Sequence, residues 1–243
     1  MRIPLTKPAR PLVKVCGLMR AEDVELAAML GAWAVGFIFA PSPRRVTPDA
    51  ARRLLLAATP AAAAASTAAA PLTVGIFGET SAEIVAAVVA DVGLGAVQLH
   101  GAEPDLSAVR RALAGGEREV LLLKVIAVPV AVSDRGAIED AVAGARELAD
   151  LLVFDTTWRG GSGGTGRTFP WEVARAAAEG APYLVAGGID PGNVHEALES
   201  SGAWGVDVSS GVEAAPGQKD HESLRALFAL VAAPRSRTEG TMN

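Results

Sequence analysis

Short, continuous runs of apolar residues recur along the chain, separated by longer segments in which apolar residues return with a helical period. Runs that are apolar throughout are typical of parallel strands buried on both faces. Eight such strand–helix units predict an α/β protein, a single-domain (β/α)8 or TIM barrel. The predicted strands span residues 12–16, 34–39, 72–77, 96–99, 120–125, 151–155, 183–186 and 204–208.

The segments between these strands carry helix signals. Glu22 and Asp23 lie in the first turn of a helix predicted over 21–30, where carboxylates suit the positive end of the helix dipole. Pro48 suits the first turn of the second helix. Further helices are predicted over 82–90, 104–113 and 138–148, from about residue 193, and over 221–230.

The chain has the length of one such barrel. Its 243 residues are close to the roughly 250 typical of the fold, and half of them are hydrophobic. We therefore predict one domain over residues 12–232, with flexible tails at 1–11 and 233–243. Residues 57–70 are almost all Ala, Thr, Ser and Pro. Alanine favours a helix, but Pro60 and the absence of periodicity favour a loose insertion that is tolerated rather than functional.

Composition and charge exclude several classes of function. The net charge is −5 with basic residues spread along the chain, which argues against a nucleic-acid partner. Cys16 is the only cysteine, so a disulfide framework and a multi-cysteine metal site are excluded. Neither a membrane span nor a signal peptide is recognisable, so we expect a cytoplasmic protein with no membrane partner. The glycines at 161–166 lack the acidic residue of a dinucleotide-binding motif, and no cofactor or metal is expected.

The last two predicted strands both end in small residues. Backbone amides that are not covered by side chains can converge on an anion, and in TIM barrels a phosphate site usually follows strands seven and eight. The sequence therefore predicts a small phosphorylated ligand at this end of the barrel. The phosphate-binding candidates are Gly187, Gly188, Ser209, Ser210 and Gly211.

Three reactive candidates lie at or near the ends of predicted strands: Cys16, Asp155 and Asp207. Side chains alternate along a strand, so Lys14 shares a face with Cys16. If that face points inward, the ammonium group of Lys14 is expected to lower the pKa of the thiol and favour the thiolate. A base and an acid on opposite sides of a small pocket would then be available.

Six short motifs are distributed along nearly the whole chain. They are Lys14-Val-Cys-Gly17, Val35-Gly-Phe-Ile-Phe39 followed by Ser-Pro-Arg-Arg-Val, Val97-Gln-Leu-His-Gly101, Phe154-Asp-Thr156 with Gly163-Gly-Thr-Gly166, Ala186-Gly-Gly188 with Asn193-Val194, and Asp207-Val-Ser-Ser-Gly-Val-Glu213 with Pro216-Gly-Gln-Lys-Asp220. In their order, and over about residues 12–231, they resemble the phosphoribosylanthranilate isomerase family. One motif alone would be weak, whereas six in register are a strong signal.

The resemblance implies an Amadori rearrangement in tryptophan biosynthesis. The substrate would be N-(5'-phosphoribosyl)anthranilate and the product 1-(2-carboxyphenylamino)-1-deoxyribulose 5-phosphate, with no cofactor. The family's general base matches Cys16 and its general acid matches Asp155. Arg45 matches the substrate-binding arginine, which would hold the anthranilate carboxylate. Lys14 and Asp207 are expected at the substrate as well, Asp207 through the sugar hydroxyls.

Several residue assignments carry conditions. An aspartate near its reference pKa of about 3.9 is a poor proton donor, so burial beside apolar neighbours such as Phe154 is expected to raise it. Arg44 is the alternative to Arg45. His100 faces the predicted site, yet we interpret it as a structural histidine. Met19 stands where family members often carry a threonine, which affects a contact to the loop or substrate.

Other readings of the whole chain stay open. A sugar-phosphate epimerase or synthase on the same kind of barrel is one, and a non-catalytic phosphate-binding barrel is another. The loop over 156–168 could be a connector or a lid, since its glycines suit either. Barrels of this kind occur as monomers and homodimers, and the sequence does not choose between them.

Overall fold

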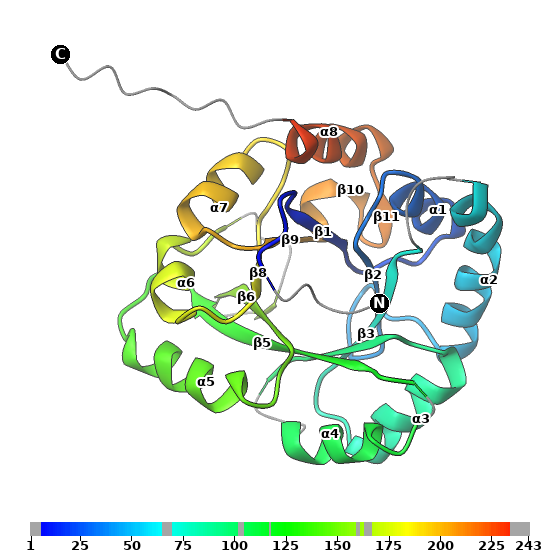
Figure 1. The fold of residues 1–243 in the computed structure, drawn as a ribbon. Helices are drawn as coiled ribbons and strands as arrows, with labels where there is room; N and C mark the ends of the chain where they lie inside the picture. Colours follow the sequence, from blue (N-terminus) through cyan, green and yellow to red (C-terminus); the bar gives the residue numbers. More distant parts are fainter. Residues whose placement is uncertain are drawn as a thin grey trace.

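Eight parallel strands form a closed barrel in the computed structural model (Figure 1), which describes residues 6–64, 70–101, 105–116, 118–158, 161–162 and 167–233. Each strand pairs with its neighbours in the order β1–β2–β3–β4–β5–β6–β8–β9, and β9 pairs with β1 to close the ring. The predicted fold is confirmed. The barrel strands are β1 (Leu12–Val15), β2 (Ala34–Ile38), β3 (Leu72–Phe77), β4 (Ala96–Leu99), β5 (Leu121–Pro129), β6 (Leu151–Trp158), β8 (Tyr183–Ala186) and β9 (Gly205–Val208).

Helices surround the barrel on the outside (Figure 1). Ser81 and Asp220 begin two of them as N-caps, because their side-chain oxygens accept hydrogen bonds from the amides of Ile84 and Ser223. The helices are α1 (Ala21–Met29), α2 (Pro48–Ala64), α3 (Ala82–Val92), α4 (Leu106–Leu113), α5 (Gly136–Arg146), α6 (Glu172–Ala177), α7 (Val194–Ser201) and α8 (His221–Ala232). None of the helices in the described ranges is long and apolar enough to span a membrane.

Several short elements lie at the carboxyl end of the barrel. Gly161–Ser162 (β7) pairs antiparallel with the end of β6. A 3-10 turn, η1 (Ser210–Val212), follows β9 and leads into a hairpin of β10 (Glu213–Ala215) and β11 (Gln218–Lys219). These additions lie in the loops where a TIM barrel carries its functional residues.

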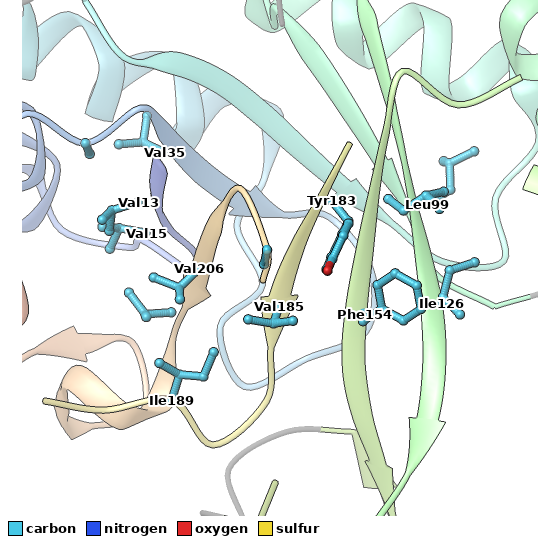
Figure 2. Packing of buried hydrophobic residues seen from close by; sticks show 14 of the residues in the cluster. Val13, Val15, Val35, Leu99, Ile126, Phe154, Tyr183, Val185, Ile189 and Val206 are labelled. Atoms are coloured by element: carbon cyan, nitrogen blue, oxygen red, sulfur yellow. The ribbon is translucent and has the colours of Figure 1, made fainter. Parts of the chain in front are cut away.

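The apolar core has two layers. The outer layer packs strand residues such as Val15 and Phe154 against the helices, and Figure 2 shows part of it. The inner layer fills the barrel with side chains such as Val74, Leu123 and Val153, which come from the strands and the residues beside them. Because side chains alternate along a strand, Val153 inside and Phe154 outside direct Asp155 inward again.

The alanine-rich segment 57–70 differs from the prediction of a loose insertion. Helix α2 extends to Ala64, so residues 57–64 are helical, while 65–69 lie outside the described residues. The intrinsic helix preference of successive alanines outweighs the lost hydrogen bond at the single Pro60. Of the predicted tails, the described residues 6–11 and 233 form neither helix nor strand. The rest of both tails lies outside the described ranges.

Candidate active site

The carboxyl ends of the barrel strands surround a cavity of about 470 Å³. It is lined by most of the predicted site residues and by several residues that were not predicted. The lining residues that matter below are Cys16, Arg44, Gln98, His100, Asp155, Gly187, Gly188, Asp207, Ser209, Ser210 and Gly211. A second cavity of about 890 Å³ shares His100 and Asp155 and extends toward α4 and α5, but its lining contains neither the cysteine nor the glycine loops.

Cys16 follows β1 and is buried at the cavity, with 8% of its surface exposed. Gly36 on the neighbouring strand makes room for it, because a Cβ atom there would lie 3.1 Å from the thiol sulfur. Burial raises the pKa of the Cys16 thiol, and Lys14 and Lys219 only partly offset that shift. The prediction that Lys14 would bring the pKa below its usual value is therefore wrong. Lys14 acts in the expected direction, but loss of water around the sulfur has the larger effect.

Lys14 and Asp207 form an ion pair inside the barrel. The strand register sets the two residues side by side on β1 and β9, and Nζ of Lys14 donates to Oδ2 of Asp207 over 2.7 Å. Burial alone would lower the pKa of Lys14, yet attraction to Asp207 and Cys16 raises it, so the ammonium stays charged. The Lys14 side chain is fully buried and does not line the cavity. Its role at the site is therefore indirect, through its two partners.

Asp155 lies within β6 and points into the cavity, where it is partly buried. Burial, and then the negative charge of Asp207, raise the pKa of its carboxyl to about 7. The amide of Thr156 and the Lys14 ammonium oppose the shift but do not cancel it. The predicted direction is confirmed. The proposed cause, burial beside Phe154, is not confirmed. Phe154 packs edge-on against Tyr183 in the outer layer, with ring centroids 5.3 Å apart.

The two glycine-containing loops after β8 and β9 lie against each other. Gly187 and Gly188 have positive φ angles of 83° and 70°, which favour glycine. A Cβ on Gly211 would lie 2.0 Å from the carbonyl oxygen of Ile189, so only glycine permits this approach. The amide N–H groups of Gly187 and Gly188 donate to no acceptor within the described part of the chain. They are available to an anion at the cavity wall.

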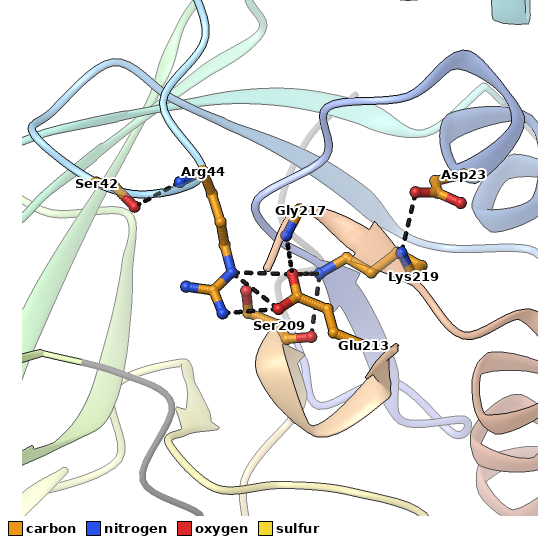
Figure 3. Close-up of polar contacts among 7 residues, drawn as sticks. All are labelled: Asp23, Ser42, Arg44, Ser209, Glu213, Gly217 and Lys219. Carbon is orange, nitrogen blue, oxygen red and sulfur yellow. Dashed lines mark hydrogen bonds and ion pairs between the residues drawn. The ribbon is translucent and has the colours of Figure 1, made fainter. Parts of the chain in front are cut away.

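A charged cluster of Arg44, Glu213 and Lys219 (Figure 3) reaches the same cavity through Arg44. Glu213 accepts hydrogen bonds from Nε and Nη2 of Arg44 at 2.6–3.0 Å and from Nζ of Lys219 at 2.9 Å. Nζ of Lys219 also donates to the carbonyl of Ser209 at 3.0 Å. Asp23 on α1 holds the backbone of Lys219 through its amide, at 3.1 Å. The cluster joins the loop after β2 to the loop after β9.

Arg45 does not occupy the position expected for it. Its side chain is exposed and does not line the cavity, whereas that of Arg44 does. An isolated bridge pairs Arg45 with Ile38, and in such extended backbone consecutive side chains point in opposite directions. The cation next to the cavity is therefore Arg44, the alternative named from the sequence.

His100 and Gln98 form a pair on β4 and the residue after it. Nε2 of Gln98 and Nε2 of His100 are 3.0 Å apart. Burial and the nearby ammonium groups of Lys14 and Lys124 lower the pKa of His100 to about 4, so its ring is neutral. The Oε1 atom of Gln98 is buried without a hydrogen-bond partner in the described part of the protein, as is Oδ1 of Asp207. Both atoms belong to residues that line the cavity and can accept a hydrogen bond from a ligand.

The family that these features indicate can be compared with known proteins. A sequence model of the family described as N-(5'phosphoribosyl)anthranilate (PRA) isomerase matches residues 13–229. The chain belongs to the phosphoribosylanthranilate isomerase family. A member of this family from Xanthomonas oryzae pv. oryzae is 39% identical over 223 residues, which cover 89% of this chain and 90% of the relative.

Solved structures of phosphoribosylanthranilate isomerases have the same architecture. The enzyme from Thermotoga maritima matches with a TM-score of 0.74 at 32% identity, covering 91% of this chain and 98% of that one. A phosphoribosylanthranilate isomerase in complex with reduced 1-(o-carboxyphenylamino)-1-deoxyribulose 5-phosphate matches with a TM-score of 0.70 at 32% identity, covering 90% and 96%. The resemblance noted in the sequence motifs is thus confirmed for the family.

Other sequence-based expectations meet the structure only in part. Met19, where phosphoribosylanthranilate isomerases often carry a threonine, packs against the β10–β11 hairpin, and a Cβ on Gly217 would lie 2.3 Å from its sulfur. Of the predicted lid or connector over 156–168, residues 159–160 and 163–166 lie outside the described residues, and the described part includes the β6–β7 pairing. Within the described ranges, no group of three His, Cys, Asp or Glu residues could hold a metal ion.

Sequence reasoning missed Gln98, Glu213 and Lys219. Gln98 and His100 are polar residues at alternate positions of an otherwise apolar strand, and this period-two pattern could have placed Gln98 on the cavity side. Glu213 and Lys219 offered no such signal. Their partner Arg44 is 169 positions away from Glu213, so only the closed barrel brings the cluster together.

Proposed function

We propose that this protein converts N-(5'-phosphoribosyl)anthranilate into 1-(2-carboxyphenylamino)-1-deoxyribulose 5-phosphate, with Asp155 as general acid and Cys16 as general base. The observation that carries the proposal is the single cavity that both side chains line together with the two glycine loops. Membership of the phosphoribosylanthranilate isomerase family and the relative crystallised with a reduced form of that product support it. The reaction would serve tryptophan biosynthesis.

Ring opening comes first. Asp155 donates its proton to the furanose oxygen, the bond from C1 to that oxygen breaks, and the nitrogen lone pair forms a C1=N iminium ion. An acid with a pKa of about 7 is largely protonated below that pH, unlike an ordinary aspartate. This step therefore uses the burial of Asp155 directly.

Isomerisation follows at C2. The Cys16 thiolate removes the C2 proton, and the electron pair of that bond moves to form C1=C2 while the iminium electrons return to nitrogen. The resulting enaminol becomes the ketone as the C2 hydroxyl loses its proton and C1 gains one. The iminium cation of the preceding step adds to the positive charges of Lys14 and Lys219, and so favours the thiolate when the base is needed.

Binding groups match the three polar parts of this substrate. The amides of Gly187, Gly188 and the Ser209–Gly211 loop would hold the phosphate. Arg44, rather than Arg45, would hold the anthranilate carboxylate, since a guanidinium suits a carboxylate. Asp207 would accept from a sugar hydroxyl at Oδ1, with Lys14 fixing Oδ2. A cytoplasmic location and a monomeric or homodimeric state stay predictions for this chain.

Loss of phosphoribosylanthranilate fluorescence in the presence of the purified protein tests the proposal. We expect turnover by the parent protein and a decrease of about 10²- to 10⁴-fold in kcat for Cys16→Ala and for Asp155→Asn. Asp150→Asn is the matched control, because Asp150 lies just before β6, pairs with Arg110 and lines neither cavity. Phosphate-ligand binding without turnover by the parent would instead indicate a non-catalytic barrel.

A further inference from the structure

The proposed reaction assigns no role to the buried carboxylate of Glu213. Glu213 begins β10, directly after the turn η1, and 4% of its side chain is exposed. It accepts five hydrogen bonds, three from Arg44, one from Nζ of Lys219 and one from the amide of Gly217 at 3.3 Å. A carboxylate with this many donors is held in one position, and it holds its donors in return.

Charge in this cluster makes Glu213 necessary to both cations. The side chains of Arg44 and Lys219 are 14% and 0% exposed, so each has lost most of its water. Without a carboxylate between them, two buried cations would repel each other and lack a counterion. With Glu213 present the cluster keeps a net charge of +1, which matches one carboxylate of a ligand.

Geometry leaves one edge of Arg44 for a ligand. The bonds to Glu213 use Nε and Nη2, and Nη1 has no hydrogen-bond partner among the described residues. The aliphatic part of Arg44 lies over Gly17, where a Cβ would approach its Cδ atom to 2.7 Å. The arginine is therefore fixed from both sides next to Cys16, with its remaining donors free.

The other partner of Glu213 reaches the phosphate loop. Lys219 donates to Glu213 and to the carbonyl of Ser209, the residue that precedes the Ser210–Gly211 turn. The dashed contacts in Figure 3 trace this path from Arg44 through Glu213 to Ser209. One carboxylate thus links a side chain suited to a carboxylate with a loop suited to a phosphate.

We propose that Glu213 is a positioning residue that fixes the separation between two anion sites, the Arg44 guanidinium and the Ser209–Gly211 loop. This proposal rests on the proposed function, because it assigns the two sites to the two ends of one substrate. It makes Glu213 a determinant of specificity for sugar phosphates that carry a second anionic group at a set distance. The residue touches no reacting atom, and its effect passes through its partners.

The test is a kinetic comparison of the parent protein with Glu213→Gln, which keeps the shape and removes the charge. We expect KM for phosphoribosylanthranilate to rise by roughly 10- to 100-fold with kcat changed by less than about 3-fold, because the two anion sites hold the substrate and the transition state alike. Inorganic phosphate should become a weaker competitive inhibitor as well. Asp150→Asn, which removes a partly buried carboxylate paired with Arg110 at the opposite end of the barrel, should leave both values unchanged.

A double-mutant cycle identifies the route of the effect. Arg44→Met alone should raise KM, and adding Glu213→Gln to it should raise KM by a smaller factor than Glu213→Gln does in the parent protein, because the part of the effect that passes through Arg44 is already lost. Independent, multiplying effects would contradict the proposal. Where Glu213→Gln does not fold, Glu213→Asp replaces it and should show an intermediate rise in KM.

The outcomes separate this inference from the proposed function. Turnover by the parent with an unchanged KM in the Glu213 variants would overturn the inference alone. A fall in thermal stability with unchanged KM would assign Glu213 a purely structural role, which also overturns it. Absence of turnover by the parent would overturn the proposed function and this inference with it.

Discussion

Cys16 at the end of β1 and Asp155 near the end of β6 both line the cavity, but burial has opposite consequences for their proposed roles. Burial raises the pKa of the thiol of Cys16 and of the carboxyl of Asp155. For an acid this shift is useful, because it keeps a proton available near neutral pH. For a base it is a cost, because it disfavours the thiolate. Lys14 and Lys219 lower the pKa of Cys16 while Asp207 raises it, whereas Asp207 is the main charged neighbour of Asp155 and raises its pKa. The pocket thus prepares the acid by desolvation, whereas the base depends on nearby ammonium groups that offset only part of the same effect.

The largest expected effects come from removing either group and following the rate against pH. Residual kcat/KM of Asp155→Asn should rise with pH up to the thiol's pKa, with no fall at high pH. That of Cys16→Ala should fall as Asp155 loses its proton near pH 7 and show no acidic limb. Each variant should lose about 10²- to 10⁴-fold in rate. A variant that keeps both limbs would show that the residue removed is neither the acid nor the base.

The next largest effect is expected from removing the ammonium group of Lys14 on β1. Lys14→Met leaves Asp207 buried without its partner and takes a positive charge from beside Cys16. We expect a loss of roughly 3–5 kcal/mol in the free energy of unfolding, measured by urea denaturation. The acidic limb of the thiol in the Asp155→Asn background should also move to higher pH. If Lys14→Met/Asp207→Leu is no more stable than Lys14→Met, the ion pair is not the source of the loss.

Burial of Asp155 should cost stability as well as serve catalysis. Its pKa in the folded protein, about 7, lies above that of an unfolded aspartate, so its contribution to stability is complete at low pH and is lost as pH rises toward 7. Asp155→Asn removes this dependence. Between pH 4 and pH 8 the variant should therefore gain roughly 2–4 kcal/mol relative to the parent, as seen by thermal or urea unfolding at each pH. A constant difference over that range would mean that the carboxyl is not desolvated.

Ion pairs on the outer surface should matter least. Arg52 on α2 pairs with Asp49 and Asp91, and 38% of its side chain is exposed. Exposed pairs are screened by water, so Arg52→Ala should change the free energy of unfolding by less than about 1 kcal/mol and leave kcat/KM unchanged. A larger effect would show that charge outside the barrel reaches the site.

Much of the fold followed from pattern alone. Eight apolar runs predicted the eight strands, with β5 and β6 extending beyond their predicted ends. One exception was the segment that ends α2, because a tract without periodicity gives no sign of which preference prevails at Pro60. The intrinsic helix preference of alanine determined the structure of this segment, and the segment has no apolar period from which its packing could be predicted.

The candidate site was predictable from the sequence where a strand fixes the direction in which a side chain points. Cys16, Asp155 and Asp207 face one cavity, as alternation along a strand requires. In the loop after β2 no period relates consecutive residues, so Arg44 and Arg45 could not be told apart from the sequence. The pKa of Cys16 was misjudged because the sequence shows which charges are near but not how much water is lost.

The pH dependence of kcat/KM for the parent protein tests the central claim most directly. With protonated Asp155 and ionised Cys16 both required, the rate should rise to a break near pH 7, remain level, and fall only above the raised pKa of the thiol, beyond a thiol's usual value of roughly 8.5. A maximum below pH 6, or a rate independent of pH, would contradict an acid and a base that are both shifted upward by one shared pocket.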